Sequence, residues 1–497
     1  MNTNYQLYHQ LLKKISDINY AVAVLQWDQE TYMPAKGATY RAQQIATLSR
    51  IAHEHFTDEK LGKLLNELIN DTTLSEKEQK NIKQTHKEYY KQKKYSASFV
   101  EEMSRTISET FQAWHQAKSN NDFNSYAPFL DKLLTLKKKE CELLGYEQHP
   151  YDAMLDQYEP GAKSTDLKTL FNDVKTNLVG FVKQISQKPQ NADAFMFADY
   201  DEQKQWDFSL YLLKQMGYDF DAGRQDKSSH PFTTHFNAHD VRVTTRVNKN
   251  DLNEIIWSTI HEGGHALYEQ GLPISEYGLP SGEYISLGIH ESQSRLWENN
   301  IGRSLAYWEF NFPKLQKVFP QNLGDVTVLD FYKAMNIVKP SLIRTSADEL
   351  TYHFHILIRF EIEMALFEGN LAVKDLPDFW NAKYKEYLGI EVPNDTKGVL
   401  QDVHWSHGSF GYFPTYSLGS FYAAQFMHTA AQQISNLGEK IKAGDLMPLL
   451  EWLRKNVHLY GKQYMAEELC QKICGEKLNF NYFMTYAKKK YSFIYTL

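Results

Sequence analysis

Hydrophobic residues recur at helical spacing in several separate stretches of the chain. In residues 7–25, 100–114 and 167–181, apolar side chains follow one another at steps of three or four. Side chains with this period lie on one face of an α-helix. Ser75 and Glu78 have the spacing of a capping box, and the Lys- and Glu-rich segment after them is typical of a solvated helix face. The pattern predicts a mainly α-helical protein.

One stretch departs from the helical period. Residues 230–247 are rich in Thr, Val and Phe, and β-branched residues alternate from Val241 to Val247. Because alternation with period two is typical of strands, we predict a short hairpin or small sheet here. Asp251 follows, and it can cap a helix over the apolar positions of residues 252–260. The small sheet is therefore expected next to this helix.

The composition is that of a folded globular protein. Of the 497 residues, 42% are hydrophobic and 14% aromatic, which provides core material that disordered chains lack. The length allows about three domain-sized cores, but no linker or repeat marks a boundary between them. Lys and Arg number 54 against 61 Asp and Glu, a net charge of −7. This balance lacks the basic excess typical of nucleic-acid binding, so we predict no nucleic-acid partner.

Neither a secretory signal nor a membrane partner is expected. The first residues are polar and show no basic segment followed by an apolar run. Residues 403–438 contain no Asp, Glu, Lys or Arg, but their His, Pro and Gln side chains would be costly in lipid. We expect this stretch to be buried in protein beside a cavity. Cys141, Cys470 and Cys474 are predicted to be free thiols, which favours a reducing, cytoplasmic location.

The strongest chemical motif is His261-Glu262-Gly263-Gly264-His265, which matches H-E-x-x-H. Histidines at i and i+4 project from one helix face and can bind a single Zn²⁺ ion, so we predict His261 and His265 as metal ligands. Glu262 is the predicted general base, which takes a proton from the water that attacks a carbonyl. The two glycines cost about 1 kcal/mol each relative to alanine, which indicates a close approach of substrate or backbone.

A catalytic zinc site takes three protein ligands, so a third is expected downstream. The metzincin arrangement is excluded, because it requires Gly and His where this chain has Tyr268 and Gly271. Glu291 and Glu298 lie two turns apart in a segment that we predict to be helical, so only one of them can bind the metal. Spacing alone leaves six candidates: Glu269, Glu276, Glu283, His290, Glu291 and Glu298.

Eight separated segments carry motifs of one protein family. They are WDQETYMP at 27–34, HPF at 230–232, DVRVT at 240–244, HEGGH at 261–265, HESQ at 290–293, IRTSAD at 343–348, GVLQDVHW at 398–405 and GYFPTY at 411–416. The chain thereby resembles the thermostable carboxypeptidase family, the carboxypeptidase Taq type of zinc metallopeptidases. The resemblance spans nearly the whole chain.

The resemblance implies zinc held by His261, His265 and Glu291, with Glu262 as general base. It thus selects Glu291 among the candidates for the third ligand. Co²⁺ can replace Zn²⁺ at such a site. The implied fold is a neurolysin-like helical saddle with a deep active-site groove, in which residues 1–497 form one catalytic unit of two helical lobes. The family also implies a homodimer.

The implied function is that of a metallocarboxypeptidase that removes single residues from the free C-termini of peptides, with broad preference. Two alternatives stand beside it. A neurolysin-like endo-oligopeptidase would cut internal bonds, and a non-catalytic scaffold would bind peptides without cutting them. A peptide with an amidated C-terminus distinguishes the carboxypeptidase, which needs a free C-terminus, from the endo-oligopeptidase, which does not.

A carboxypeptidase must place a cation opposite the terminal carboxylate of its substrate, and arginine suits this role because it can donate two parallel hydrogen bonds. Arg344 and Arg242 are the candidates. Each has a structural alternative, since Arg344 can pair with Asp348 and Arg242 with Asp240.

Neutral donors are expected in the charge-free stretch. Tyr412, Tyr416 and His404 can donate to the oxyanion of a tetrahedral intermediate or to the terminal carboxylate. His230 is a further candidate for substrate contact, and Asp402 for orienting an imidazole.

Overall fold

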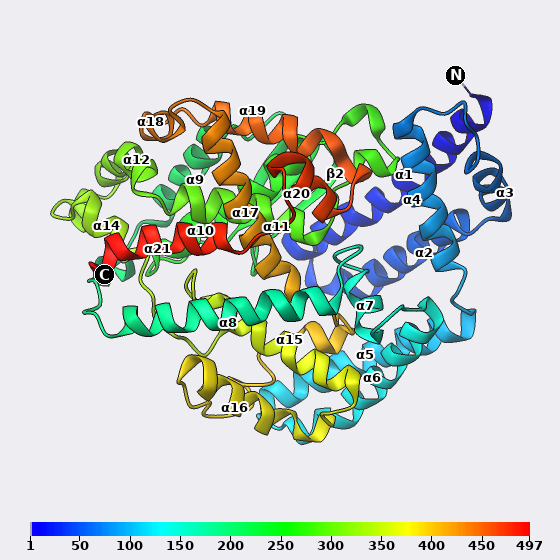
Figure 1. Ribbon diagram of the computed structural model, residues 1–497, viewed down its shortest axis with the longest axis horizontal. Helices are drawn as coiled ribbons and strands as arrows, with labels where there is room; N and C mark the ends of the chain where they lie inside the picture. Colours follow the sequence, from blue (N-terminus) through cyan, green and yellow to red (C-terminus); the bar gives the residue numbers. More distant parts are fainter. Residues whose placement is uncertain (1) are drawn as a thin grey trace. The chain divides into compact units, whose positions relative to one another are not determined.

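The computed structural model describes residues 2–497 and divides into two compact units. Unit 1 comprises Met1–Lys93, Asn191–Met335 and Tyr422–Leu478, and unit 2 comprises Lys94–Gln190, Asn336–Phe421 and Asn479–Leu497. Each unit is therefore assembled from stretches that are distant in the sequence. Most of the regular structure is helical, which confirms the mainly α prediction (Figure 1).

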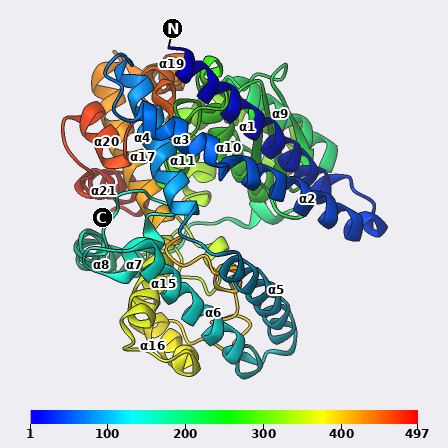
Figure 2. The same ribbon diagram turned by 90° about the vertical axis from the view of Figure 1, so that its right-hand side faces the viewer.

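The helices of each unit pack in neighbouring pairs. In unit 1, α1 lies beside α2, and in unit 2, α5 lies beside α6 (Figures 1 and 2). The helices of unit 1 are α1 (Thr3–Thr31), α2 (Ala38–Phe56), α3 (Glu59–Leu68), α4 (Glu76–Gln92), α9 (Glu202–Met216), α10 (Leu252–Gln270), α11 (Leu287–Arg295), α12 (Leu305–Val318), α13 (Pro320–Leu323), α14 (Val328–Ala334), α18 (Leu437–Lys442), α19 (Met447–Asn456) and α20 (Ala466–Cys474). Those of unit 2 are α5 (Ala97–Asn120), α6 (Phe123–Leu144), α7 (Pro150–Leu155), α8 (Ser164–Ser186), α15 (Tyr352–Glu368), α16 (Leu376–Leu388) and α21 (Asn481–Tyr495), while α17 (Pro414–Gln433) begins in unit 2 and ends in unit 1.

Helix α1 forms where the periodicity predicts it, and Ile15 and Val22 of the predicted apolar face are buried, but its first turns bury tyrosines instead. Tyr5 and Tyr8 are buried, whereas Leu7 is 48% exposed. The tyrosine rings pack against α3 and α4, where their hydroxyls meet polar partners: Tyr8 bonds Thr85 at 2.7 Å and Tyr5 accepts from Asn81 at 3.0 Å. Hydrophobic spacing alone does not show such partners, because they lie on another helix.

The predicted hairpin is present in unit 1. Strand β2 (Thr233–Asn237) pairs antiparallel with β3 (Asp240–Thr245). A third strand, β1 (Gly223–Lys227), pairs with β3 in parallel, so the sheet order is β1-β3-β2. The sequence does not predict β1, because GRQDK is polar and its Gln225 and Asp226 are buried polar residues. Strand β2 therefore lies at an edge of the sheet.

Helix α10 packs against this sheet and against α9 and α11. It begins where predicted, since the side chain of Asp251 accepts a hydrogen bond from the backbone N–H of Asn253. A hydrogen bond of 2.6 Å joins Ser258 of α10 to Thr245 of β3. Burial of most of its side chains holds α10 in a fixed place, as a helix that carries a binding site requires.

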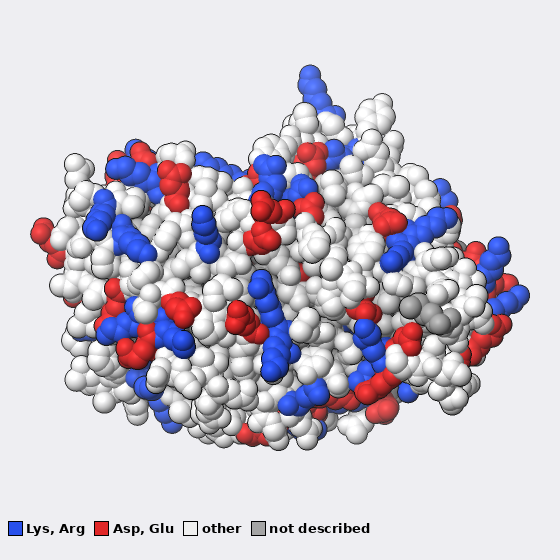
Figure 3. Space-filling view, turned by 90° about the horizontal axis from the view of Figure 1, so that it is seen from above, with Lys and Arg blue, Asp and Glu red and all other residues white. Residues whose placement is uncertain are grey.

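The predicted burial of the charge-free stretch is confirmed along most of its helix. Most of α17 is buried in protein. Among the helices of residues 2–497, none is both long and apolar enough to cross a membrane. On the face shown in Figure 3, positive and negative side chains are interspersed.

Candidate active site

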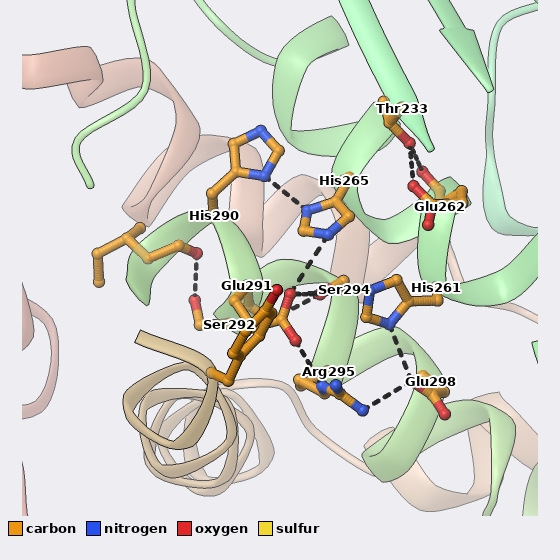
Figure 4. Close-up of polar contacts among 12 residues, drawn as sticks. Thr233, His261, Glu262, His265, His290, Glu291, Ser292, Ser294, Arg295 and Glu298 are labelled. Atoms are coloured by element: carbon orange, nitrogen blue, oxygen red, sulfur yellow. Dashed lines mark hydrogen bonds and ion pairs between the residues drawn. The ribbon is translucent and has the colours of Figure 1, made fainter. Parts of the chain in front are cut away.

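The three predicted metal ligands converge in unit 1. Helix α10 presents His261 and His265, and α11 brings Glu291 opposite them (Figure 4). Glu291 Oε2 lies 3.7 Å from His261 Nε2 and 3.4 Å from His265 Nε2, and all three ligand atoms lie within 4.8 Å of one another. Ligands bound to a tetrahedral zinc ion at about 2.0–2.1 Å are about 3.4 Å apart. The nitrogen and oxygen donors therefore fit a metal ion of this kind.

The close packing of α10 on α11 depends on Gly264. A Cβ at Gly264 would lie 2.7 Å from Ser294 Cα and 2.8 Å from the carbonyl oxygen of Gln293, both backbone atoms of α11. A Cβ at Gly263 would instead meet side-chain ends of α9, with Leu213 Cδ2 at 2.7 Å. Gly264 thus provides the close backbone approach that the motif predicts, and this approach brings α11 to the histidines.

Glu298 contacts the other ring nitrogen of His261. It lies in a π-helical segment, η5 (Leu296–Gly302), that directly follows α11. Its Oε2 is 2.9 Å from His261 Nδ1. When Nε2 faces a metal, Nδ1–H donates to this carboxylate, which orients the ring and raises its basicity. Of these two of the six candidates, Glu291 faces the shared ligand position and Glu298 contacts the far side of the His261 ring.

Two arginines keep these carboxylates ionised. Arg295 donates to Glu291 at 2.6 Å and lies 3.2 Å from Glu298, which Arg303 also contacts at 3.0 Å. Burial opposes ionisation, but Arg295 and His261 hold the pKa values of Glu291 and Glu298 well below the ordinary range. The site therefore offers anionic oxygen atoms to a cation.

The predicted general base, Glu262, is buried and held by strand β2. The hydroxyl of Thr233 lies 2.7 Å from Glu262 Oε2 and 2.9 Å from its backbone carbonyl oxygen (Figure 4). Burial raises the pKa of Glu262, while His261 and the hydrogen bond from Thr233 oppose that rise. A carboxylate with a raised pKa is a stronger base, as proton abstraction requires.

The other four candidates for the third ligand lie outside the convergent set found among residues 2–497: Glu269, Glu276, Glu283 and His290. Glu276 pairs with Lys77, and Glu283 accepts a hydrogen bond of 2.7 Å from Tyr20. Glu269 and His290 bond each other at 2.7 Å, and His290 also contacts His265. Their carboxylates and imidazole are thus engaged elsewhere.

In unit 2, Arg344 belongs to a buried cluster of charges. Its guanidinium lies 3.0 Å from Asp402, which also pairs with the fully buried Arg359. The alternative pairing of Arg344 with Asp348 is wrong, because Asp348 accepts hydrogen bonds from Thr351 and from backbone N–H groups instead. Among residues 2–497, Asp402 is the one carboxylate that pairs with either arginine. Two guanidinium groups sharing one carboxylate leave an excess positive charge.

The predicted neutral donors of unit 2 gather beside this cluster. His404 Nε2 lies 3.4 Å from the Tyr416 hydroxyl, the Tyr412 and Tyr416 ring centroids are 5.3 Å apart, and the Arg344 guanidinium is 5.0 Å from the Tyr416 ring. Burial and the neighbouring arginines lower the pKa of His404 to about 4, so its ring is neutral at pH 7. Its buried Nδ1 has no hydrogen-bond partner within residues 2–497.

Arg242 and His230 lie in other surroundings. Arg242 makes two hydrogen bonds of 2.9 Å to Asp240, the structural alternative for this residue, and its guanidinium lies 4.3 Å from the Trp27 ring. His230 is exposed in the turn before β2. Neither residue shares the charge cluster of Arg344.

Several buried polar residues near these clusters have no counterpart in the sequence predictions. Glu363 accepts hydrogen bonds from Tyr151 at 2.5 Å, Trp405 at 2.7 Å and the backbone N–H of Gly411 at 2.9 Å, and burial raises its pKa to about 7. Glu363 and Arg359 are buried charged residues in the apolar helix α15, and this contrast is a signal that sequence alone carries. Thr233 carries no such signal, since Thr is ordinary in a strand.

Comparison with known proteins identifies the family. The family model of the carboxypeptidase Taq (M32) metallopeptidases matches residues 7–491. The chain belongs to this carboxypeptidase Taq family. It is 40% identical over 489 residues to carboxypeptidase 1 of Bacillus subtilis, covering 98% of each chain, and 40% identical over 488 residues to thermostable carboxypeptidase 1 of Thermus thermophilus, covering 95% of each. The crystal structure of an M32 carboxypeptidase from Deinococcus radiodurans matches it with a TM-score of 0.98 at 36% identity, covering 100% of both chains.

Membership of the carboxypeptidase Taq family makes the protein a metallopeptidase, and hence an enzyme that hydrolyses peptides. Such an enzyme depends on a divalent metal ion, and the cluster of His261, His265 and Glu291 is the candidate site for it.

Proposed function

We propose that the protein is a zinc-dependent carboxypeptidase that removes single residues from the C-termini of peptides, with broad preference. The observation that carries the proposal is the convergence of His261, His265 and Glu291 beside Glu262. Two imidazoles and one carboxylate are a common ligand set for catalytic zinc, and Co²⁺ can replace zinc there. The family membership and the names of the relatives support the same activity.

In this proposal the metal is held by Nε2 of His261, Nε2 of His265 and Oε2 of Glu291. A zinc ion so held polarises the carbonyl of the scissile bond and lowers the pKa of water. Glu262 removes the proton from the attacking water and delivers it to the leaving amine, and the hydroxyl of Thr233 keeps its carboxylate oriented.

Recognition of the free C-terminus is assigned to unit 2. Arg344 binds the terminal carboxylate, and the excess positive charge of its cluster with Arg359 and Asp402 supports this role. His404, Tyr412 and Tyr416 donate hydrogen bonds to the substrate. The support for His404 is its neutral ring with an unpaired buried Nδ1.

Weaker roles in substrate contact are proposed for Arg242 and His230. Arg242 lies next to β2, an edge strand, and extended peptides add to such edges. The pair with Asp240 lowers the expected contribution of Arg242, because a neutralised guanidinium attracts a carboxylate less.

We also propose that the enzyme is a cytoplasmic homodimer. The free cysteines Cys141, Cys470 and Cys474 support a reducing compartment, and the dimer rests on the family resemblance. Light scattering of the purified protein measures its mass directly, and a mass of 58.0 kDa, that of one chain, would exclude the dimer.

A ladder-forming digest tests the activity. One peptide is prepared with a free and with an amidated C-terminus, and both are incubated with the zinc-loaded enzyme and followed by mass spectrometry. We expect stepwise loss of single residues from the free form only, and none after chelation. Cleavage of internal bonds in both peptides would indicate an endo-oligopeptidase, and binding without cleavage would indicate a scaffold.

A further inference from the structure

His290, the residue before Glu291, contacts His265 on the side opposite the ligand position. The Nδ1 atoms of the two rings are 2.6 Å apart (Figure 4). On its other side, His290 Nε2 is 2.7 Å from Glu269 Oε1. Two ligands of one zinc ion are about 3 Å or more apart, so His265 and His290 do not bind one ion through these atoms. The short contact is instead a hydrogen bond.

The direction of these hydrogen bonds follows from the proton count. If His265 offers Nε2 to the metal, its proton is on Nδ1 and points to His290. Nδ1 of His290 must then be bare, which leaves the proton of His290 on Nε2, where Glu269 accepts it. One set of tautomers therefore satisfies both hydrogen bonds, from His265 to His290 and from His290 to Glu269.

We propose that His290 and Glu269 act as positioning residues that fix the ring and the tautomer of His265 for metal binding. The inference rests on the proposed function, because it assumes that His265 is a metal ligand. Groups that accept a proton from a metal-bound histidine typically change metal affinity by about 10- to 100-fold.

Burial and a second contact hold Glu269 in place. Its side chain is 2% exposed, and Oε1 also lies 3.2 Å from Nδ1 of His235 on strand β2. Thr233, which holds Glu262, is two residues earlier on the same strand. Residues i and i+2 of a strand point to the same side. We call the hydrogen-bonded series Glu269–His290–His265 the relay. Strand β2 thus contacts both the general base, through Thr233, and the relay, through His235.

The two histidines of the motif are supported in different ways. Nδ1 of His261 reaches a carboxylate directly at Glu298, whereas His265 reaches one only through His290. Replacing His290 therefore removes the support of His265 and leaves that of His261 intact.

Metal affinity of purified, metal-free protein provides the test. The dissociation constant for Zn²⁺ is measured by competition with a chromophoric chelator for the wild type, His290→Phe and His290→Gln. Phenylalanine keeps the ring volume and removes both hydrogen bonds. Glutamine keeps no ring, but its Oε1 can accept from His265 and its Nε2 can donate to Glu269.

We expect His290→Phe to bind Zn²⁺ about 10- to 100-fold more weakly than the wild type. His290→Gln is expected to fall between the two. A packing role predicts the reverse order, so equal affinity of His290→Phe and wild type, or a loss in His290→Gln as large as that in His290→Phe, overturns the proposal. The exposed His239→Phe serves as control and should leave the affinity unchanged.

Glu269→Gln provides an independent route if a variant of His290 fails to fold, as judged by circular dichroism of the metal-free protein. It removes the charge at the end of the relay and is expected to weaken Zn²⁺ binding less than His290→Phe; wild-type affinity contradicts the proposal. A wild-type protein without any tight Zn²⁺ site contradicts the proposed function itself, whereas unchanged affinity in the variants contradicts only the relay.

Discussion

Unit 1 and unit 2 bury charges of opposite sign around their candidate functional residues. In unit 1, Arg295 and Arg303 pair with Glu291 and Glu298, and Glu262 lies on the same helix as the two histidines. When His261 and His265 have neutral rings, as metal binding requires, these three carboxylates and two guanidinium groups leave an excess of one negative charge. In unit 2, Arg344, Arg359 and Asp402 leave an excess of one positive charge.

An unbalanced buried charge is costly, so it is retained where a ligand supplies the opposite charge. The negative excess of unit 1 suits a metal cation, and the positive excess of unit 2 suits the carboxylate at the end of a peptide. These are the two charged partners of a metallocarboxypeptidase. The comparison therefore supports the proposed roles, in which unit 1 carries out the chemistry of the bond and unit 2 recognises the chain end.

Removing the general base should break the chemistry of unit 1 without changing its metal. We expect Glu262→Gln to lower kcat by about 10²- to 10⁴-fold, because the amide cannot accept the proton of water. Zinc content, measured by mass spectrometry, should stay at the wild-type level. Glu254→Gln on the same helix, where Glu254 pairs with Arg246, is the control. Full turnover in Glu262→Gln would remove this residue from the mechanism.

The negative cluster should also depend on the approach of α11 to α10. Gly264→Ala places a Cβ against the backbone of Ser294 and should cost about 1–3 kcal/mol of unfolding free energy, with weaker zinc binding. Gly263→Ala meets the flexible end of Leu213 and should cost less. Urea denaturation and zinc titration of the two variants compare them. Equal effects of the two variants would contradict the claim that the metal site depends more on the packing of α10 against α11 than on its packing against α9.

In unit 2, removing the excess positive charge should impair recognition of the chain end. Arg344→Met is expected to lower kcat/KM for peptides with a free C-terminus by about 10- to 100-fold, the loss of a charge-assisted hydrogen bond. Arg242→Met should have a smaller effect, because Asp240 already neutralises Arg242. Steady-state kinetics with one peptide measures both, and a larger loss in Arg242→Met would reverse the assignment.

Glu363 is the buried carboxyl group of unit 2 whose ionisation would cancel that positive excess. Burial raises its pKa from 4.5 to about 7, so between these values the folded protein binds a proton that the unfolded chain has released. Stability should therefore fall as pH rises through this window, by about 1–3 kcal/mol relative to Glu363→Gln. Urea unfolding of both proteins at pH 5 and pH 8 measures the difference, and a pH-independent difference would contradict the raised pKa.

Local features of the fold could be predicted from the sequence. Hydrophobic spacing predicts α1 and α8, the Ser75 capping box begins α4, and alternation predicts the hairpin of β2 and β3. Each depends on neighbours in the chain. The burial of Tyr5 and Tyr8 at the start of α1 and the strand β1 could not be predicted, because buried polar groups such as those of Tyr8 and Gln225 are satisfied by distant residues.

In the candidate site, too, features set by neighbouring residues could be predicted and those set by distant residues could not. The motif alone indicates His261, Glu262 and His265, because all three lie within two turns of one helix. Spacing could not choose between Glu291 and Glu298, since the choice depends on how α11 approaches Gly264 and on the π-helical segment that follows it. Contacts across 58 residues, such as that of Arg344 with Asp402, leave no local pattern either.

A crystal structure of the zinc-soaked protein, with anomalous diffraction at the zinc edge, tests the central claim most directly. We predict one zinc ion per chain, bound at about 2 Å by Nε2 of His261, Nε2 of His265 and Oε2 of Glu291. Zinc bound by Glu298 in place of Glu291, or no zinc between the two histidines, would contradict it.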